Sequence, residues 1–207
     1  MARSFPTNLC ACGLVLALGL ASVAQESSSN GQELVLESAL LTFNSETKVF
    51  EIEAPKIRQG DLYVSADDAV ATSIDFESAS EWRFKGHVRI ESGAAVIDAD
   101  SAVFTFTEGQ LSRGELVGAP ATFTHTVPER PKPTTGTADS ISYDHTARTL
   151  RMSGNALLQR EQNQIQSCDL IYNLTTEGFT SGNSDCGFRL VRVAPASDQR
   201  DGPTPPP

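Results

Sequence analysis

Positive charge is scarce in this chain, and so are the residues from which enzyme sites are usually built. Its 207 residues include 16 lysines and arginines against 26 acids, so nucleic acid is not an expected partner because phosphate binding needs clustered cations. Three histidines occur, His87, His125 and His145, without a glycine-framed serine, and we interpret each as a solvated side chain. The sequence has no glycine-rich phosphate loop and no Cys/His spacing typical of zinc sites. We therefore expect no enzymatic activity, no metal and no cofactor.

Carboxylate pairs are present at Asp67 with Asp68 and at Asp98 with Asp100. Such pairs could serve sugar hydrolysis or bind calcium. They recur at the same position of a repeat, however, and a catalytic pair would not need to be copied. The repetition favours a role in the architecture.

Long apolar runs are limited to residues 9–23, preceded by a single cation and followed by the small residue Ala24. This run of 15 residues is shorter than the roughly 20 that span a bilayer. We expect a signal peptide over residues 1–24, removed on export, with the mature chain beginning at Gln25. The alternative is a retained membrane anchor.

Cysteine is rare, and only Cys168 and Cys186 follow the predicted signal peptide. An even number of cysteines in an oxidising compartment permits a disulfide. We expect these two to pair, closing a loop with 17 residues between them.

What the sequence does contain is a pattern of short alternating runs rich in Val, Ile, Phe and Thr, which predicts an all-β fold. One motif, built around a small residue, returns at Ala54, Gly86, Gly118 and Gly154, in steps of 32, 32 and 36 residues. The longer step is explained by a proline-rich loop insertion within residues 127–136. The chain is thus predicted to stack about four repeats of about 32 residues into one sheet system.

A second motif of the form apolar, any, small, Asp follows the first in three of the four repeats. It contains Asp67 and Asp100, and in the last repeat Cys168 stands where the aspartate is expected. Two motifs at matching offsets make a chance repeat improbable. From residue 194 the chain turns to Ala, Ser, Asp, Gly and Pro, so residues 194–207 are predicted to be a disordered Pro-rich tail outside a domain of residues 25–193.

Strand alternation assigns side chains to faces. In the second repeat one parity is apolar and the other is cationic or polar. The apolar residues of the second and fourth repeats are Trp82, Phe84, Val88, Ile90, Leu150, Met152, Ala156 and Leu158. Periodicity alone cannot decide whether this face belongs to a filled sandwich core or to an open groove.

The segment 82–180 resembles the OstA-like family, which includes the periplasmic A component of the lipopolysaccharide transport bridge. The residues that carry the resemblance occur in the family's order, at 84–88, 97–103, 118–123, 136–144 and 150–159, with residues 34–38 similar to its opening strand. The resemblance implies an open, folded-over β-jellyroll whose apolar interior holds acyl chains. It also implies a periplasmic carrier that hands lipopolysaccharide from inner-membrane to outer-membrane components and associates head to tail with domains of the same fold.

By the same resemblance, Leu34, Leu36, Phe123, Ile141 and Tyr143 lie on the inner face. Together with the eight residues that strand alternation assigns to the apolar face, they form the predicted lipid-binding residues. Two alternatives remain open: an inner-membrane-anchored component of the same system, and a structural β-repeat module that binds proteins through strand edges and holds no lipid.

Overall fold

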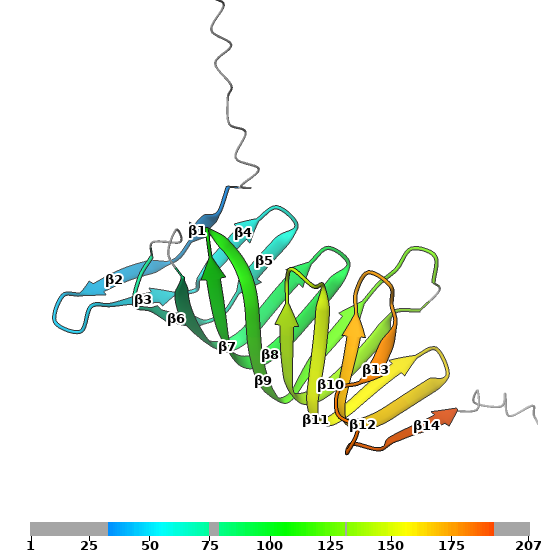
Figure 1. The fold of residues 1–207 in the computed structure, drawn as a ribbon. Coiled ribbons are helices and arrows are strands. Elements are labelled where there is room, and N and C mark those ends of the chain that lie inside the picture. Colours follow the sequence, from blue (N-terminus) through cyan, green and yellow to red (C-terminus); the bar gives the residue numbers. More distant parts are fainter. Residues whose placement is uncertain (1–32, 75–78, 131, 193–207) are drawn as a thin grey trace, which may run out of the picture. The chain divides into compact units, whose positions relative to one another are not determined.

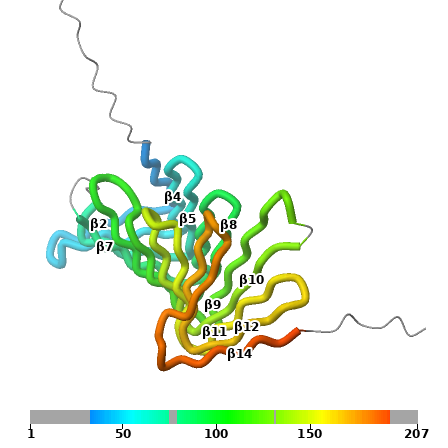
Figure 2. Tube along the Cα trace, turned by 45° about the vertical axis from the view of Figure 1, so that its right-hand side comes forward, coloured from blue at the N-terminus to red at the C-terminus, as the bar shows by residue number. Residues whose placement is uncertain are grey.

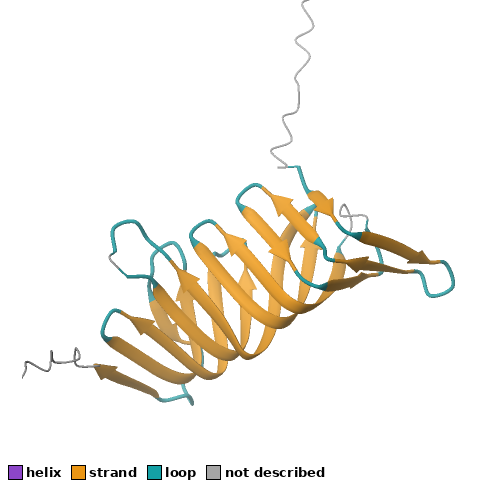
Figure 3. Ribbon diagram, turned by 180° about the vertical axis from the view of Figure 1, so that it is seen from behind, coloured by secondary structure: helices purple, strands orange, loops and turns teal. Residues whose placement is uncertain are grey.

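The computed structural model describes residues 33–74, 79–130 and 132–192, and everything said of the structure concerns these residues. The predicted signal peptide (1–24) and the predicted tail (194–207) lie outside them. The described chain forms fourteen antiparallel strands in one sheet and contains no helix (Figures 1 and 3). Their bounds are β1 Val35–Glu37, β2 Leu40–Asn44, β3 Val49–Glu53, β4 Lys56–Gln59, β5 Leu62–Ser65, β6 Asp68–Ala71, β7 Ser80–Ser92, β8 Ala95–Thr107, β9 Gln110–His125, β10 Thr134–Asp144, β11 Thr149–Arg160, β12 Asn163–Asn173, β13 Phe179–Ser181 and β14 Phe188–Arg192.

The six long strands β7 to β12 pair with their sequence neighbours, and every pair shifts register near its middle. In β7 the shift follows Lys85, where Gly86 and His87 have φ angles of 74° and 43°. In β11 it follows Ser153, where Gly154 and Asn155 have φ angles of 73° and 47°. Glycine adopts this left-handed region without a steric penalty, so the repeated small residues mark β-bulges that bend the strands.

Each bent strand contributes one half to each of two leaves. The first leaf contains β2, β3, β6, β13 and the halves 80–85, 101–107, 110–117, 140–144, 149–153 and 169–173. The second leaf contains β1, β4, β5, β14 and the halves 88–92, 95–99, 121–125, 134–138, 156–160 and 163–167. We call the line of bulges between the leaves the spine, and the free ends of the leaves the lips.

At the N-terminal end the same bend appears as a break between short strands. Ala54, with a φ of 48°, and Pro55 separate β3 from β4, while Ala66 and Asp67 separate β5 from β6. As a result β3 and β6 continue the first leaf and β4 and β5 the second, as the branching in Figure 1 shows. The end strands β1 and β2 do not pair with β13 or β14 among the described strands, so the sheet is open, and β2 and β14 lie at opposite ends of it (Figure 2).

The predicted all-β, open jellyroll fold is therefore confirmed, with corrections in detail. The segment 34–38, expected to form the opening strand, contains β1 and ends at a break over residues 38–39, after which β2 begins. The repeats are built from long bent strands instead of short ones, because the bulges let a strand bend without ending. The proline-rich insertion extends over residues 126–133, and β10 already begins at Thr134.

Candidate functional site

The two leaves enclose one continuous apolar core that runs from β3 to the turn after β12. It includes eleven of the predicted residues as fully or almost fully buried side chains: Trp82, Phe84, Val88, Ile90, Phe123, Ile141, Tyr143, Leu150, Met152, Ala156 and Leu158. The remaining two, Leu34 and Leu36, are partly buried and pack against it. The structure thus brings all thirteen into contact with one core.

Aromatic side chains line much of the first leaf's inner face. Trp82 contacts Phe106 edge-on with ring centroids 5.8 Å apart, and Phe84 lies 4.9 Å from Phe104. Phe104 and Phe106 are not among the residues predicted from the sequence for this face. The alternation of β8 is weaker than that of β7, because Val96 and Val103 lie on its other face and its buried positions change from odd numbers up to Ala99 to even numbers from Ala102.

The interior is filled by its own side chains in this structure. Trp82, Phe104 and Leu158, which come from both leaves, have no exposed surface at all. A ligand held between the leaves would therefore have to part them.

Aspartates reinforce the spine. Asp67 Oδ2 lies 2.7 Å from His87 Nδ1, Asp100 Oδ2 accepts the Ala119 backbone N–H at 3.0 Å, and Asp139 accepts Asn155 Nδ2 at 2.9 Å. Each aspartate thus contacts the bulge of the following strand. A Cβ atom at Gly86 or Gly154 would overlap the aspartate side chain beside it.

These contacts give three of the four paired carboxylates, Asp67, Asp98 and Asp100, a structural role. Asp98 binds Arg89 Nη1 at 2.8 Å on the outer face, whereas its neighbour Asp100 is bound to the β9 bulge. The hydrogen bond to Asp67 raises the pKa of His87, which is exposed to solvent. Within the described ranges, no group of three or more His, Cys, Asp or Glu side chains is arranged to hold a metal ion.

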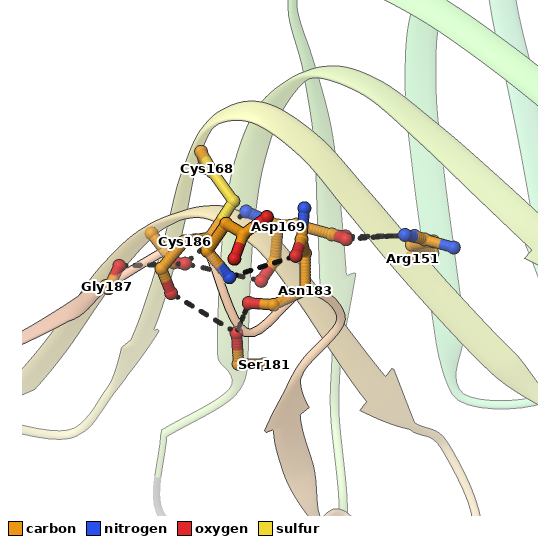
Figure 4. The surroundings of a disulfide bond; sticks show 9 residues. Arg151, Cys168, Asp169, Ser181, Asn183, Cys186 and Gly187 are labelled. Carbon is orange, nitrogen blue, oxygen red and sulfur yellow. Dashed lines mark hydrogen bonds and ion pairs between the residues drawn. A yellow bond between two sulfur atoms is a disulfide. The ribbon is translucent and has the colours of Figure 1, made fainter.

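In the last repeat a disulfide takes the place of the aspartate contact. Register places Cys168 opposite the β11 bulge, as Asp100 lies opposite the β9 bulge, and Cys168 is joined to Cys186 with Cα atoms 5.5 Å apart (Figure 4). The adjacent Asp169 is almost buried and accepts two hydrogen bonds from Arg151. The connection between β13 and β14 is thereby tied to β12.

Polar contacts bridge the two lips at four places along the sheet, and together we call them the lip seam. Gln59 Nε2 donates to the Gly109 carbonyl at 2.6 Å. Tyr143 Oη donates to Ser92 Oγ at 2.8 Å, and Arg148 Nη1 donates to the same oxygen at 2.7 Å.

The other two bridges lie toward the C-terminal end. His125 Nδ1 and Tyr172 Oη share a hydrogen bond of 2.9 Å. Arg130 Nε donates to Glu177 Oε2, and Arg160 Nη2 donates to the Glu177 carbonyl, each at 2.5 Å. Both arginines belong to the second leaf's lip, and Glu177 belongs to the turn that follows β12 in the first leaf.

The expectation that all three histidines are solvated is wrong for His125, which is buried in the seam. Burial lowers its pKa, and the charges of Arg148 and Arg160 lower the pKa further against an opposing contribution from Glu177. Burial also lowers the pKa of His145, whose ring shares a hydrogen bond with Tyr143.

Exposed apolar side chains gather at the two ends of the sheet. They are Val35, Leu40, Leu41 and Phe43 at the N-terminal end, and Phe179, Phe188 and Leu190 at the C-terminal end. At the latter end a pocket of about 320 Å³ is lined by Ile165, Leu170, Phe179, Thr180, Ser181 and Phe188. In residues 33–74, 79–130 and 132–192 no helix is long and apolar enough to cross a bilayer.

Comparison with known proteins relates this arrangement to lipopolysaccharide transport. A family described as LptA/(LptD N-terminal domain) LPS transport protein matches residues 63–178. The lipopolysaccharide export system protein LptA of Escherichia coli strain K12 is 30% identical over 120 residues, which is 57% of this chain, and the same protein of Shigella flexneri matches equally. The match spans 64% of the length of these relatives.

A solved structure shares the fold. It is LptH from Pseudomonas aeruginosa, described as the LptA homologous periplasmic component of the conserved lipopolysaccharide transport device. It superimposes with a TM-score of 0.51 at 12% identity, covering 79% of this chain and 96% of that one. At this identity the likeness extends to the fold alone.

Proposed function

Because more than half of its length matches the family, this chain belongs to the LptA/LptD N-terminal-domain family of lipopolysaccharide transport proteins, and we propose that it carries lipopolysaccharide by holding the acyl chains of lipid A between its two leaves. The observation that carries the proposal is the single apolar core that continues from β3 through β12. An uninterrupted apolar path of this kind can accept hydrocarbon chains at many equivalent positions. A carrier needs this property, because its cargo must move along it.

The energy balance supports such binding. Each methylene removed from water gains about 0.8 kcal/mol, so an acyl chain of about a dozen methylenes gains roughly 10 kcal/mol. The neutral hydrogen bonds of the lip seam contribute about 1 kcal/mol each, and those donated by Arg130, Arg148 and Arg160 about 1.5–3 kcal/mol each. Acyl chains can therefore replace the contacts between the two inner faces and open the lips. The phosphorylated head group stays outside the apolar interior, so the carrier as a whole can be acidic.

We further infer that the carrier works in the periplasm, receiving lipopolysaccharide from inner-membrane components and passing it to outer-membrane components. The open ends of the sheet fit such a relay. Phe188 is 69% exposed in β14 and Leu40 is 52% exposed in β2, and neither strand has a neighbour on its outer side among the described strands. An unpaired strand edge can recruit another strand, so head-to-tail addition would continue the interior from one domain to the next.

Light scattering tests this association. Particle mass should grow with protein concentration, and Phe188→Glu should suppress the growth. The matched variant Val117→Glu alters an equally apolar side chain that is 53% exposed in the middle of the sheet, and it should leave the growth unchanged. A monomer at all concentrations for the unaltered chain would refute head-to-tail association.

Native mass spectrometry of the folded protein tests lipid binding. After incubation with lipid A, the spectrum should contain a protein–lipid complex. Met152→Lys should lose it, because an unpaired charge on the inner face costs several kcal/mol in contact with acyl chains. Where circular dichroism shows that this variant is unfolded, the neutral Met152→Gln replaces it. Arg83→Ala, which removes an exposed outer-face cation, should keep the complex. Equal losses from folded inner-face and outer-face variants would refute the assignment of faces.

A further inference from the structure

The lips of the two leaves are bonded to each other, although the proposed cargo has to lie between the leaves. The seam joins positions far apart in sequence, such as Ser92 with Tyr143 and Arg130 with Glu177, separated by 51 and 47 residues. Its contacts come from turns and strand ends that belong to different repeats. The tyrosine contact occurs twice, at Ser92 and at His125, whereas the contacts of Gln59 and Glu177 each occur once.

The position of the seam determines what it resists. The leaves are continuous through the bulges of the spine, so the spine is where they can flex when they part. The lips lie at the opposite ends of the same strand halves and move the farthest. A given opening therefore stretches a bond across the lips farther than a contact of the same kind near the spine.

The C-terminal part of the seam carries charged groups that could also bind a ligand when the leaves part. Two guanidinium groups of one lip, on Arg130 and Arg160, converge on Glu177 of the other lip. The Arg130 and Glu177 side chains are only 32% and 20% exposed, so both charges are partly shielded from water. If the leaves part, Glu177 moves away with the first leaf. Arg130 then loses its carboxylate, and Arg160 loses the Glu177 carbonyl and keeps Thr134 Oγ1, 3.3 Å from its Nε, in its own leaf.

We propose that this part of the lip seam is the gate through which acyl chains pass sideways into the interior, and that Arg130 and Arg160 exchange Glu177 for a phosphate of the lipid's head group as it opens. The inference rests on the proposed function and adds the route and the head-group site to it. Guanidinium groups bind phosphate oxygens through paired N–H donors as well as they bind carboxylates. In a phosphorylated lipid the phosphates lie beside the attached acyl chains, so chains between the leaves place phosphates at the lips. The exchange gives Arg130 a new anionic partner, and it gives Arg160 an acceptor in place of the Glu177 carbonyl, while the gate is open.

The experiment uses the only tryptophan of the chain, Trp82, which is buried in the interior. Stopped-flow mixing with synthetic lipid A that carries brominated acyl chains reports, by quenching of Trp82 emission, when chains that enter at the gate have reached β7, five strands along the sheet from β12. The same lipid without its phosphates is the second probe. Glu177→Gln removes the charge that holds Arg130 and keeps the size of the side chain. Its control is Glu81→Gln, which breaks an arginine–glutamate pair on the outer face of one leaf.

We expect Glu177→Gln to speed quenching about tenfold, the factor that corresponds to one charge-assisted hydrogen bond lost from the closed state. Glu81→Gln should keep the original rate. The affinity of the unaltered chain for the phosphorylated lipid should exceed its affinity for the lipid without phosphates by a factor of about five or more. The double variant Arg130→Gln, Arg160→Gln should open readily and lose this preference.

The outcomes separate the gate from the carrier. The gate is overturned if Glu177→Gln leaves the quenching rate unchanged, or if the folded double variant keeps its preference for the phosphorylated lipid. In either case, quenching of Trp82 by the lipid would still support the proposed function. Absence of quenching by either lipid in every folded variant removes the proposed function, and the gate with it. Circular dichroism and thermal melting establish that each variant is folded.

Discussion

The spine and the lips of the folded sheet are both held by polar contacts, but they are built in different ways. Along the spine one arrangement recurs, in which an aspartate contacts the bulge of the next strand: Asp67 with His87, Asp100 with Ala119, and Asp139 with Asn155. Along the lips a tyrosine hydroxyl contacts the second leaf's strand end twice, at Ser92 and at His125, whereas the contacts at Gln59 and Glu177 each occur once. The difference teaches that a repeated polar contact serves the architecture, whereas a singular one is where a function specific to the whole domain can be sought.

The comparison predicts that the spine is the more sensitive region to small changes in backbone. Gly154→Ala should lower the free energy of unfolding by about 3 kcal/mol, because it adds left-handed strain to an overlap with Asp139. Chemical denaturation measures the effect. The control Gly187→Ala places a methyl group where no atom lies within 4 Å and should change stability by less than about 0.5 kcal/mol. Equal effects of the two variants would remove the spine's special role.

The disulfide sharpens the comparison at the last repeat, where a covalent bond stands in the place of a spine contact. Breaking it with Cys186→Ser should lower the free energy of unfolding by about 2 kcal/mol. This is less than the loss that chain entropy alone gives for a loop of this length, because β14 retains its pairing with β12. Thiol counting on protein purified without reductant checks the bond itself, and two free thiols there would contradict the pairing. The same denaturation assay then gives the cost of its loss.

The smallest predicted effect distinguishes the two regions by the sign of a pH dependence. The pKa of His125 in the seam is lowered from 6.5, so the unfolded chain binds its proton more readily. Its contribution to stability is complete above about pH 6.5 and is lost as the pH falls toward its folded-state pKa. The pKa of His87 at the spine is raised, so its contribution is complete below about pH 6.5 and is lost as the pH rises through its folded-state pKa.

Two variants separate these opposing contributions. Between about pH 7.5 and about pH 5.5, the loss of unfolding free energy should be smaller in His125→Asn and larger in His87→Asn than in the unaltered chain. Denaturant titrations at both pH values measure it. The reverse order would mean that the charge states assigned to the lip and the spine are wrong.

The spine could be predicted from the sequence because its determinants are local and repeated. Gly86 and Gly154 recur at matching offsets and mark bulges, and Cys168 stands at the position of Asp100 in the register as in the sequence motif. The inner face could be predicted equally well, since alternation places Phe84 and Met152 on it without reference to any distant residue.

The lips could not be predicted in this way. The partner of His125 is Tyr172, 47 residues away, and no periodicity connects a strand end in one leaf with a strand end in the other. From its polar neighbours Thr124 and Thr126, His125 is therefore predicted to be solvated, although the fold buries it. Pairing across the lips depends on how far each strand extends beyond its bulge, which is a property of the folded sheet.

The central claim is that acyl chains lie between the leaves, and quenching of Trp82 tests it most directly. Trp82 has no exposed surface and contacts Phe106 inside the first leaf, so a brominated acyl chain quenches it only from the interior. The measurement is steady-state emission during titration with brominated lipid A, with unbrominated lipid A as control and native mass spectrometry to establish binding. The account predicts saturable quenching that follows the bound fraction. Bound lipid with unchanged Trp82 emission would place the acyl chains elsewhere and contradict it.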